Sequence, residues 1–341
     1  MGHFLFFLLL FVPLSLFLLL YVLIRPRPTR VPIRGRNVVI SGGSSGIGLA
    51  IAHQAASEGA QVTILARDPK KLEDASRSIQ SATGNSNVTA LSVDVRDFAA
   101  VKRALESCSS VDVLICNHGV FVPQELEEQT IETVKYMLDI NLLGTFNLIK
   151  AALPIMKKRK DNVPASIALM SSQAGQVGIY GYAAYSASKF GLRGLGEALQ
   201  QEVIADNIHV TLIFPPDTET PGLLEEQKSR PSITNILAES SSAMKAKDVA
   251  RKALDGIKSA NFVVSCNFDG FMLSLATSGM SPQRSVLTAF IEVVAAGLLR
   301  LVALFYQWKW YGMIERCHAK EKKYVLNGCR MALDLRCLQL S

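Results

Sequence analysis

The residues with the clearest chemical potential are a tyrosine and a lysine four positions apart, Tyr185 and Lys189, in the run Tyr-Ser-Ala-Ser-Lys. They lie in a stretch, 183–205, whose pattern predicts a helix, and their i,i+4 spacing places both side chains on one face. A phenol alone has a pKa of about 10, too high to exchange protons readily near neutral pH. Because a nearby ammonium favours the phenolate, we expect Tyr185 to act as a general acid toward a ketone oxygen while a nicotinamide delivers hydride.

A tyrosine and a lysine at this spacing also occur by chance, and the alternative is an exposed helical pair. Further polar residues favour the chemical interpretation. Ser172 ends a predicted strand thirteen residues before Tyr185, and Asn141 lies in a long predicted helix, 131–159. Asn117 and Asp94 each follow a predicted strand. The sequence therefore predicts one polar constellation rather than an isolated pair.

A glycine-rich turn follows the first predicted strand, in the run Ser-Gly-Gly-Ser-Ser-Gly-Ile-Gly that begins at residue 41. Its glycines at Gly42, Gly46 and Gly48 allow a tight turn and a close approach of the backbone to a pyrophosphate. The helix that follows supplies free N–H groups and a partial positive charge. This position at the first strand–helix junction predicts a dinucleotide site.

The same turn also matches the nucleophile elbow of hydrolases, with Ser44 between Gly42 and Gly46. An elbow serine needs a histidine partner, and only His118 and His209 lie in the remaining core region. An elbow normally follows a middle strand rather than the first. The dinucleotide interpretation is therefore favoured over the hydrolase.

The end of the second predicted strand indicates which dinucleotide is used. An enzyme specific for NAD places an acidic residue there, whereas an arginine suits the 2′-phosphate of NADPH. Here the acidic position has no carboxylate, and Asp68 comes one residue past an arginine. The alternative is a solvated basic start of a helix. NADPH is favoured, because positive charges and hydroxyls converge at this point: Arg67, Lys70, Lys71, Ser44 and Ser45.

These residues are carried by alternating strands and helices. Apolar, strand-like runs occur at 37–41, 61–66, 87–93, 111–116, 166–172 and 209–214. Segments of helical length lie between them, at 46–58, 69–80, 97–107, 131–159 and 183–205. Continuous apolar strands alternating with helices predict a Rossmann-like doubly wound α/β fold, with ligands at the carboxyl ends of parallel strands. We expect it to span 37–265, with a proline-rich functional loop after 214 and a helix and strand near 246–265.

The N-terminal segment 1–24 contains an uncharged apolar run from Phe4 to Ile24. Roughly 20 such residues span the hydrocarbon core of a bilayer, so the sequence predicts an uncleaved transmembrane anchor. Five arginines follow in the linker 25–36 and place the bulk of the chain in the cytosol. The net charge of +7 owes much to this linker, which fits anionic membrane lipids, whereas nothing indicates binding of nucleic acid.

The C-terminal region 266–323 carries apolar runs at 271–280 and 285–308, the second interrupted by Glu292 and Arg300. It predicts either a membrane-associated hairpin or a helix that covers the substrate entrance, and the basic residues after it favour the hairpin. The two charges are expected to pair or to face protein. The tail 324–341 has no interpretable pattern, and the six cysteines lack the spacing of a metal site or a disulfide framework.

With these motifs in place, residues 37–265 resemble the short-chain dehydrogenase/reductase family. The resemblance implies a catalytic tetrad of Asn141, Ser172, Tyr185 and Lys189. In it Ser172 orients the carbonyl, Lys189 also holds the nicotinamide ribose and Asn141 positions a proton-relaying water. It further implies that Asp94 contacts adenine and that Asn117 belongs to the nucleotide site. The chain departs from the family at His118, which we expect to line the pocket wall, and at Pro216, where the family has glycine.

The run Phe-Pro-Pro-Asp-Thr-Glu-Thr-Pro-Gly that starts at Phe214 resembles the 3-ketodihydrosphingosine reductases within that family. This implies reduction of a long-chain sphingoid ketone, 3-dehydrosphinganine, to sphinganine at the cytosolic face of the endoplasmic reticulum. It also implies that Arg67 and Lys71 hold the NADPH phosphate, and that copies of the chain pair as a dimer or tetramer. Alternatives within the fold are a membrane-anchored hydroxysteroid or retinol dehydrogenase and a 3-ketoacyl-CoA reductase. Outside enzymes, the alternative is a silent nucleotide-binding scaffold.

Overall fold

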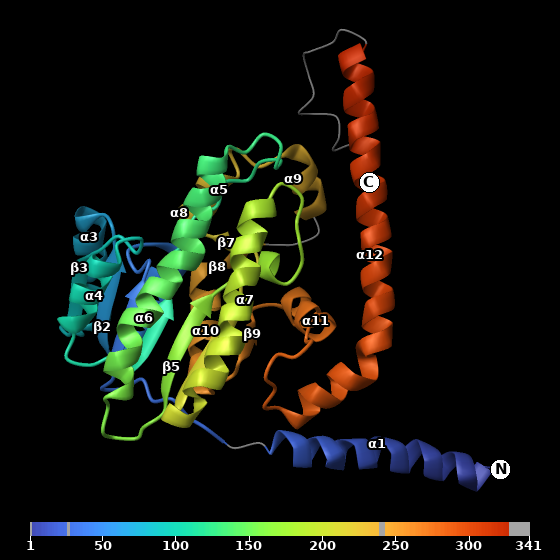
Figure 1. The fold of residues 1–341 in the computed structure, drawn as a ribbon, viewed down its shortest axis with the longest axis horizontal. Coiled ribbons are helices and arrows are strands. Elements are labelled where there is room, and N and C mark those ends of the chain that lie inside the picture. Colours follow the sequence, from blue (N-terminus) through green and yellow to red (C-terminus); the bar gives the residue numbers. More distant parts are fainter. Residues whose placement is uncertain (1, 26–27, 239–242, 327–341) are drawn as a thin grey trace.

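The computed structural model describes residues 2–25, 28–238 and 243–326. At its centre is a seven-stranded parallel sheet in the order β3-β2-β1-β4-β5-β6-β9 (Figure 1). The strands are β1 (Asn37–Ser41), β2 (Gln61–Ala66), β3 (Val88–Ser92), β4 (Val113–Cys116), β5 (Ala165–Met170), β6 (Ile208–Phe214) and β9 (Val263–Ser265). The six predicted strands and the closing one therefore form, with bounds that shift by at most two residues.

Helices cover both faces of this sheet, as the doubly wound prediction requires. One face carries α2 (Gly46–Ser57), α3 (Pro69–Thr83) and α10 (Ala246–Lys258). The other carries α4 (Phe98–Glu106), α6 (Gly144–Lys157) and α7 (Ala183–Val203). The central strands have no solvent face, which explains why a run such as Val-Leu-Ile-Cys in β4 is apolar throughout and buried at every residue.

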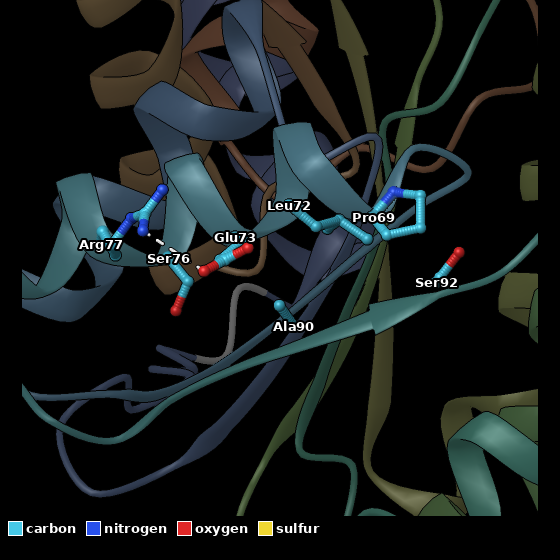
Figure 2. A pocket seen from close by; sticks show the side chains of 7 residues that line it. All are labelled: Pro69, Leu72, Glu73, Ser76, Arg77, Ala90 and Ser92. Carbon is cyan, nitrogen blue, oxygen red and sulfur yellow. Dashed lines mark hydrogen bonds and ion pairs between the residues drawn. The ribbon is translucent and has the colours of Figure 1, made fainter.

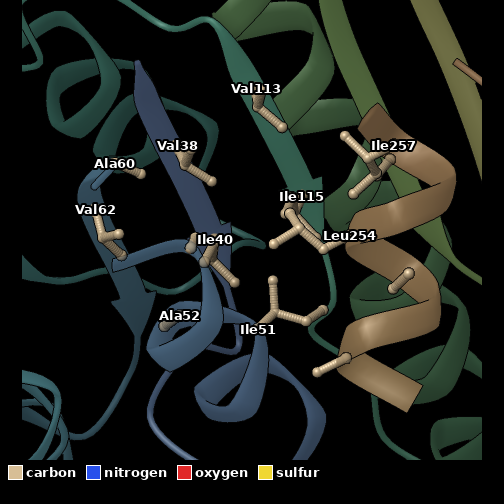
Figure 3. Packing of buried hydrophobic residues seen from close by; sticks show 14 of the residues in the cluster. Val38, Ile40, Ile51, Ala52, Ala60, Val62, Val113, Ile115, Leu254 and Ile257 are labelled. Carbon is tan, nitrogen blue, oxygen red and sulfur yellow. The ribbon is translucent and has the colours of Figure 1, made fainter. Parts of the chain in front are cut away.

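The core on the first face shows how the helices are fixed to the sheet. Ile40 of β1 and Ile115 of β4 pack against Ile51 of α2 and Leu254 of α10, and all four are fully buried (Figure 3). Truncating such a leucine to alanine typically costs about 2–5 kcal/mol of stability. This packing holds the start of α2, and with it the glycine-rich turn, in a fixed position over the sheet.

The order of the strands determines where a ligand can bind. From β1 the chain moves outward through β2 and β3, and it then returns to the other side of β1 to form β4, β5 and β6. The crevice at such a reversal lies outside the carboxyl ends of the strands and is where open α/β sheets bind ligands. Here the reversal lies between β1 and β4, so the turns that follow these two strands face each other.

The stretch after β6 is more ordered than the functional loop we expected. It contains two short helices, α8 (Pro221–Glu226) and α9 (Ser232–Ala238), and a two-stranded sheet of β7 (Thr218–Glu219) and β8 (Met244–Lys245). The local sequence explains α8, because Thr220 accepts a hydrogen bond from the Leu223 amide as an N-cap and Pro221 occupies the first turn. The proline-rich composition had obscured this helix.

Two apolar helices lie outside the layers that sandwich the sheet. They are α1 (Gly2–Ile24), which has no charged residue, and α12 (Val286–Leu326) (Figure 1). The helices contact each other, with the rings of Phe17 and Phe290 6.1 Å apart. Residues 286–320 are long and apolar enough to cross a membrane, and so are residues 131–157, which instead form a wall of the domain and are far more buried.

The C-terminal region does not form the membrane hairpin that its basic flank favoured. Its first apolar run lies largely in α11 (Phe268–Ala276), nine residues long and packed beside β9, which is too short to cross a bilayer. The second run is one continuous helix, α12. Glu292 faces protein, where it accepts a hydrogen bond from Gln283, and Arg300 is exposed.

The far part of α12 lies against the substrate side of the domain. It packs beside α9, and the hydroxyl of Tyr180 lies 3.1 Å from the Nε2 atom of His318. This arrangement fits the alternative prediction of a helix covering the substrate entrance. Residues 26–27 of the basic linker and most of the predicted tail, 327–341, lie outside the described residues, and the predicted segment boundaries stay predictions.

Candidate active site

The glycine-rich turn after β1 has the shape of a phosphate cradle. Gly42 has a φ of +66°, which glycine adopts without strain, and a Cβ on Gly48 would stand 2.3 Å from the Gly42 carbonyl oxygen. The Nδ2 atom of Asn117, at the end of β4, donates to that same carbonyl over 3.3 Å. The first turn of α2 then presents backbone N–H groups, so the predicted residues do form a site that fits a pyrophosphate.

The ring of His118, which we expect to line the pocket wall, is held by hydrogen bonds at both of its nitrogens. Its Nε2 atom lies 3.0 Å from the carbonyl oxygen of Ile140, and its Nδ1 atom lies 2.7 Å from the hydroxyl of Ser41. Because a carbonyl can only accept, Nε2 carries the proton and Nδ1 accepts from Ser41. Burial lowers the pKa of His118 to about 4, so the ring is neutral near pH 7. His118 therefore ties β1 to the helix that carries Asn141.

This arrangement also removes the hydrolase alternative. A nucleophile elbow would need Ser44 to contact a histidine. His118 contacts Ser41 instead, and His209 lies within β6, where its Nε2 atom contacts Asn207. Neither core histidine pairs with Ser44.

Tyr185 and Lys189 lie in the first half of α7, on the face that looks toward the end of β5. Lys189 is only 4% exposed, and its Nζ atom donates to the Met170 carbonyl over 2.9 Å. The same ammonium lies 5.6 Å from the centre of the Tyr185 ring. The hydroxyl of Ser172, two residues beyond β5, is close enough to the Tyr185 phenol to lower its pKa. The structure therefore brings the predicted serine, tyrosine and lysine together.

The electrostatics of this group differ from our expectation. We expected Lys189 to lower the pKa of Tyr185, but burial, with a smaller contribution from the charge of Asp217, raises it to about 12. The hydrogen bond with Ser172 acts in the opposite direction. Burial also lowers the pKa of Lys189 to about 8. Because the ammonium of Lys189 donates to the Met170 carbonyl, the loss of hydration of the phenolate has the larger effect on the pKa of Tyr185.

Asn141 lies in a π-helical turn, η1 (Asp139–Leu143), which interrupts the predicted helix 131–159 between α5 (Ile131–Leu138) and α6. Its side chain is fully buried and forms hydrogen bonds with both backbone groups of Val120 and with the Ser188 hydroxyl. A π-helical turn often marks a functional site. Asn141 therefore joins the turn after β4 to α7, and its side chain is fully used in that role.

The residues predicted to select NADPH lie at the edge of the same crevice. Arg67 follows β2 and is exposed, as is Lys71 in the first turn of α3. Asp68 caps α3 by accepting from the Lys70 and Lys71 amides. Its carboxylate is therefore used within α3 and does not replace the acidic residue that an NAD-specific enzyme has at the end of this strand. Ser44 and Ser45 belong to the turn itself, where the Ser45 side chain makes no capping hydrogen bond.

Asp94, which follows β3, is already paired with a neighbour. Its two carboxylate oxygens accept from the Arg96 guanidinium, and this pair lowers the pKa of Asp94. Arg67 adds a smaller favourable interaction, which places it near Asp94. A contact with adenine would therefore have to share a carboxylate that Arg96 occupies.

A buried charged cluster beside Tyr185 was missing from the sequence prediction. Arg230 forms ion pairs with Asp217 and Glu226, and the Tyr182 hydroxyl donates to Glu226. The ring of Tyr182 lies 5.7 Å from that of Tyr185. Asp217, Glu226 and Arg230 lie in the stretch that we expected to be a loop, and their charges follow no helical or strand periodicity. Only the resemblance of the run from Phe214 pointed to this stretch.

A separate open pocket of about 320 Å³ lies between α3 and β3 (Figure 2). Its lining includes Leu72 and Arg77, and Arg77 is paired with Glu73 and Asp74. Ser92, at its rim, donates to the carbonyl of Arg67 over 3.0 Å. The pocket contains none of the predicted catalytic residues and is distinct from the crevice between β1 and β4.

A doubly wound parallel sheet with a glycine cradle and a buried tyrosine–lysine–serine group defines an oxidoreductase that acts on a carbonyl or an alcohol. Residues 36–231 match the short chain dehydrogenase family. The chain belongs to the short-chain dehydrogenase/reductase family, as its motifs predicted.

Curated relatives match almost the entire chain. The 3-dehydrosphinganine reductase TSC10A of Arabidopsis thaliana is 63% identical over 86% of this chain and 90% of its own length. The 3-dehydrosphinganine reductase TSC10B of the same plant is 58% identical, over 94% and 96%. The 3-ketodihydrosphingosine reductase of Bos taurus is 39% identical, over 90% and 94%.

Solved structures share the fold of the domain. One, described as a short chain dehydrogenase/reductase family protein, has a TM-score of 0.61 and 25% identity and covers 69% of this chain and 97% of its own. A short-chain dehydrogenase from Sphingobium yanoikuyae in complex with NADPH has a TM-score of 0.61 and 24% identity, and covers 68% and 88%. These likenesses describe the domain rather than α1 and α12.

Proposed function

We propose that this protein reduces 3-dehydrosphinganine to sphinganine with NADPH, as a step of sphingolipid synthesis. The observation that carries the proposal is the match of relatives with that name over 86% and 94% of the chain, at 63% and 58% identity. Such coverage extends well beyond residues 36–231, which any member of the larger family would match. It therefore distinguishes this substrate from steroids, retinal and acyl-CoA.

The geometry supplies a consistent mechanism. Bound NADPH would transfer hydride to the ketone carbon from its nicotinamide ring. Ser172 and Tyr185, whose hydroxyls interact with each other, would present both of them to the ketone oxygen. As negative charge develops on that oxygen, Tyr185 donates its proton, so that a hydride and a proton together complete the alcohol. Lys189 lies on the same side, with three N–H donors and one engaged by Met170, and can bind the nicotinamide ribose.

Asn141 acts in this proposal as a positioning residue. Its side chain fixes Val120 and Ser188, and Ser188 in turn donates to the carbonyl of Tyr185 over 2.6 Å. The turn after β4, on the nucleotide side of the site, and α7, which carries Tyr185, are thus held at a fixed distance from each other. The proton-relaying water implied by the family resemblance would have to use the backbone near Asn141, because its side chain is committed.

The nucleotide is proposed to be NADPH rather than NADH. Gly42, Gly46 and Gly48 with Asn117 shape the turn that would receive the pyrophosphate. Arg67 and Lys71 are exposed cations at the end of β2, and Ser44 and Ser45 add hydroxyls near by. A guanidinium and an ammonium suit a phosphate dianion better than a neutral ribose hydroxyl.

We further propose that the enzyme is held at the endoplasmic reticulum membrane with its domain in the cytosol. Support comes from two apolar helices, α1 and α12, which lie outside the central sheet and its covering helices and contact each other. Most large apolar side chains of α12 are exposed, including Leu298, Leu301 and Phe305. A single-chain lipid ketone resides in the bilayer, so an enzyme attached there meets its substrate at high local concentration.

Two copies of the chain are proposed to pair, as the family resemblance implies. Exposed apolar side chains on neighbouring helices support this, namely Leu143 in η1, Phe146 in α6 and Phe190 in α7. Sedimentation of the detergent-solubilised protein would show a dimer or tetramer, and Phe146→Lys would shift it toward a monomer. A monomeric wild type would refute the pairing.

The experiment that tests the substrate is an assay of the purified full-length chain with NADPH. The panel contains a long-chain 3-keto amine, a keto steroid, retinal and a 3-ketoacyl-CoA. Preferential turnover of the keto amine is the expected result. Preference for another ketone would refute the substrate assignment, and absence of turnover with nucleotide binding intact would indicate the silent scaffold.

A further inference from the structure

The cluster beside Tyr185 carries an imbalance of charge. It contains the carboxylates of Asp217 and Glu226 and the single guanidinium of Arg230. The Arg230 and Glu226 side chains are 5% and 6% exposed, whereas that of Asp217 is 35% exposed. Two carboxylates therefore share one guanidinium, which leaves the cluster able to bind a second cation.

The hydrogen bonds locate that surplus at Asp217. Arg230 directs Nε and Nη2 to one oxygen of Glu226, which also accepts from the Tyr182 hydroxyl. Its Nη1 atom donates to Oδ2 of Asp217 over 2.9 Å. Among the described residues, nothing donates to Oδ1 of Asp217, so this partly exposed oxygen can receive a donor from outside the cluster.

Asp217 also lies on the reacting side of the cleft. Arg230 links Asp217 to Glu226, Glu226 accepts from the hydroxyl of Tyr182, and the ring of Tyr182 lies 5.7 Å from that of Tyr185. The charge of Asp217 accordingly raises the pKa of Tyr185. The residues that follow it cover the nucleotide turn, since the Thr220 side chain would be 3.1 Å from a Cβ on Gly46. Phe121 closes the same wall: its ring is edge-on to Tyr185 at 6.0 Å and would be 3.2 Å from a Cβ on Gly222.

We propose that Asp217 binds the ammonium group of an amino ketone substrate and that Arg230 is the positioning residue that holds it. This inference rests on the proposed function. In 3-dehydrosphinganine the ammonium is on the carbon next to the ketone, so its binding residue must lie beside Tyr185 and Ser172. Lys189 is a cation in the same site and repels a second one, which makes a carboxylate necessary.

Binding of the substrate ammonium to Asp217 would also assist proton transfer from Tyr185. The charge of Asp217 opposes ionisation of Tyr185 in the unliganded site. A bound ammonium neutralises Asp217 and is itself a cation near the phenol, and both effects favour transfer of the Tyr185 proton. A ketone without the amine lacks this assistance. The site thereby discriminates against neutral ketones such as steroids and retinal.

The test compares two substrates that differ only in the amine: 3-dehydrosphinganine and 1-hydroxyoctadecan-3-one. Asp217→Asn is expected to lower kcat/KM for the amino ketone about 10- to 100-fold, the range for a lost charge-assisted hydrogen bond, and not to lower it for the desamino ketone, because the charge that opposes ionisation of Tyr185 is removed. Glu219→Gln is the matched control, because it removes an exposed carboxylate two residues away on β7. It should change neither substrate.

Two results would overturn the proposal. One is an equal loss on both ketones, which would mean that Asp217 only supports the fold, and the other is no loss on the amino ketone. If Asp217→Asn does not fold, the wild type still decides, since it must prefer the amino ketone about 10- to 100-fold. A wild type that ignores 3-dehydrosphinganine refutes the proposed function and this inference together, whereas normal wild-type turnover with an unaffected variant refutes the inference alone.

Discussion

His118 donates from Nε2 to the carbonyl oxygen of Ile140 over 3.0 Å, inside the π-helical turn that carries Asn141. The other ring nitrogen accepts from Ser41, the last residue of β1. One buried imidazole thus joins the strand that precedes the glycine turn to the helix that precedes the tyrosine. The nucleotide and catalytic halves of the site are held together through this contact.

We predict that His118→Ala lowers the free energy of unfolding by about 1–3 kcal/mol, because it removes the ring's hydrogen bonds with the Ser41 hydroxyl and the Ile140 carbonyl. Chemical denaturation in detergent measures this change. His53→Ala is the control: His53 on α2 is half-buried, and the one hydrogen bond of its ring among the described residues is a long one to Ser78, at 3.3 Å, so its loss should cost less than about 0.5 kcal/mol. Equal stability of the His118 variant and the wild type would show that the contacts of His118 with Ser41 and Ile140 do not stabilise the fold.

Acidification should destabilise the fold between about pH 6.5 and 4. Burial lowers the pKa of both His118 and His209 from 6.5 to about 4, so in this window the unfolded chain binds protons that the folded chain does not. Stability therefore rises with pH, by up to ~1.4 kcal/mol per pH unit for each histidine. Urea titrations at pH 7.5, 6 and 5 measure the slope.

His209→Asn serves as the control for that slope. Glu226 opposes the trend, because burial raises its pKa, so the difference between variant and wild type isolates the histidine contribution. The variant should lose less stability than the wild type between pH 7.5 and 5. An identical slope in both proteins would show that His209 titrates normally in the fold.

The sequence was sufficient for the sheet and for most of the site. Strands buried on both faces are apolar throughout, so they can be recognised from composition. The glycine turn and the Tyr185–Lys189 spacing are local patterns that can be recognised without knowledge of the fold. Ser172 was found because it ends a strand whose carboxyl end must meet the crevice. Local chemistry plus strand order was enough to bring these residues together.

The remainder depends on contacts between distant segments. The π-helical turn at Asn141 leaves no trace in composition, since it differs from an α-helix only in hydrogen bonding. His118 could not be placed because its partners, Ser41 and Ile140, are 77 and 22 residues away in the sequence. The pKa of Tyr185 depends on desolvation, which a spacing of four residues does not reveal.

Tyr185→Phe should abolish turnover while nucleotide binding persists. The phenol of Tyr185 is the side chain assigned as proton donor to the ketone oxygen, and loss of a general acid typically costs about 10²- to 10⁴-fold in rate. Steady-state reduction measures the loss, and quenching of tryptophan fluorescence by NADPH measures binding. Unchanged turnover would defeat the assignment of Tyr185.

Arg67→Ala should weaken the use of NADPH about 10- to 100-fold in kcat/KM and leave NADH almost unaffected, because only NADPH has the 2′-phosphate. Arg77→Ala is the matched control, an exposed arginine on α3 that is paired with Glu73 and Asp74. It should alter neither nucleotide. A loss of equal size with NADH would assign Arg67 a role in folding instead.

Arg284→Gln should loosen the junction where the chain leaves the domain for α12. Its guanidinium donates to the Thr29 hydroxyl over 2.7 Å and to the Ala260 carbonyl over 3.2 Å, joining the segment after α1 to the end of α10. Because a partly buried guanidinium holds both segments, we expect a loss of about 1–3 kcal/mol in the free energy of unfolding. Thr29→Val removes only the first contact, and a double-mutant cycle should give a coupling of about 0.5 kcal/mol or more. Strictly additive effects would mean that Arg284 and Thr29 do not interact in solution, and that α1 and α12 are joined to the domain independently.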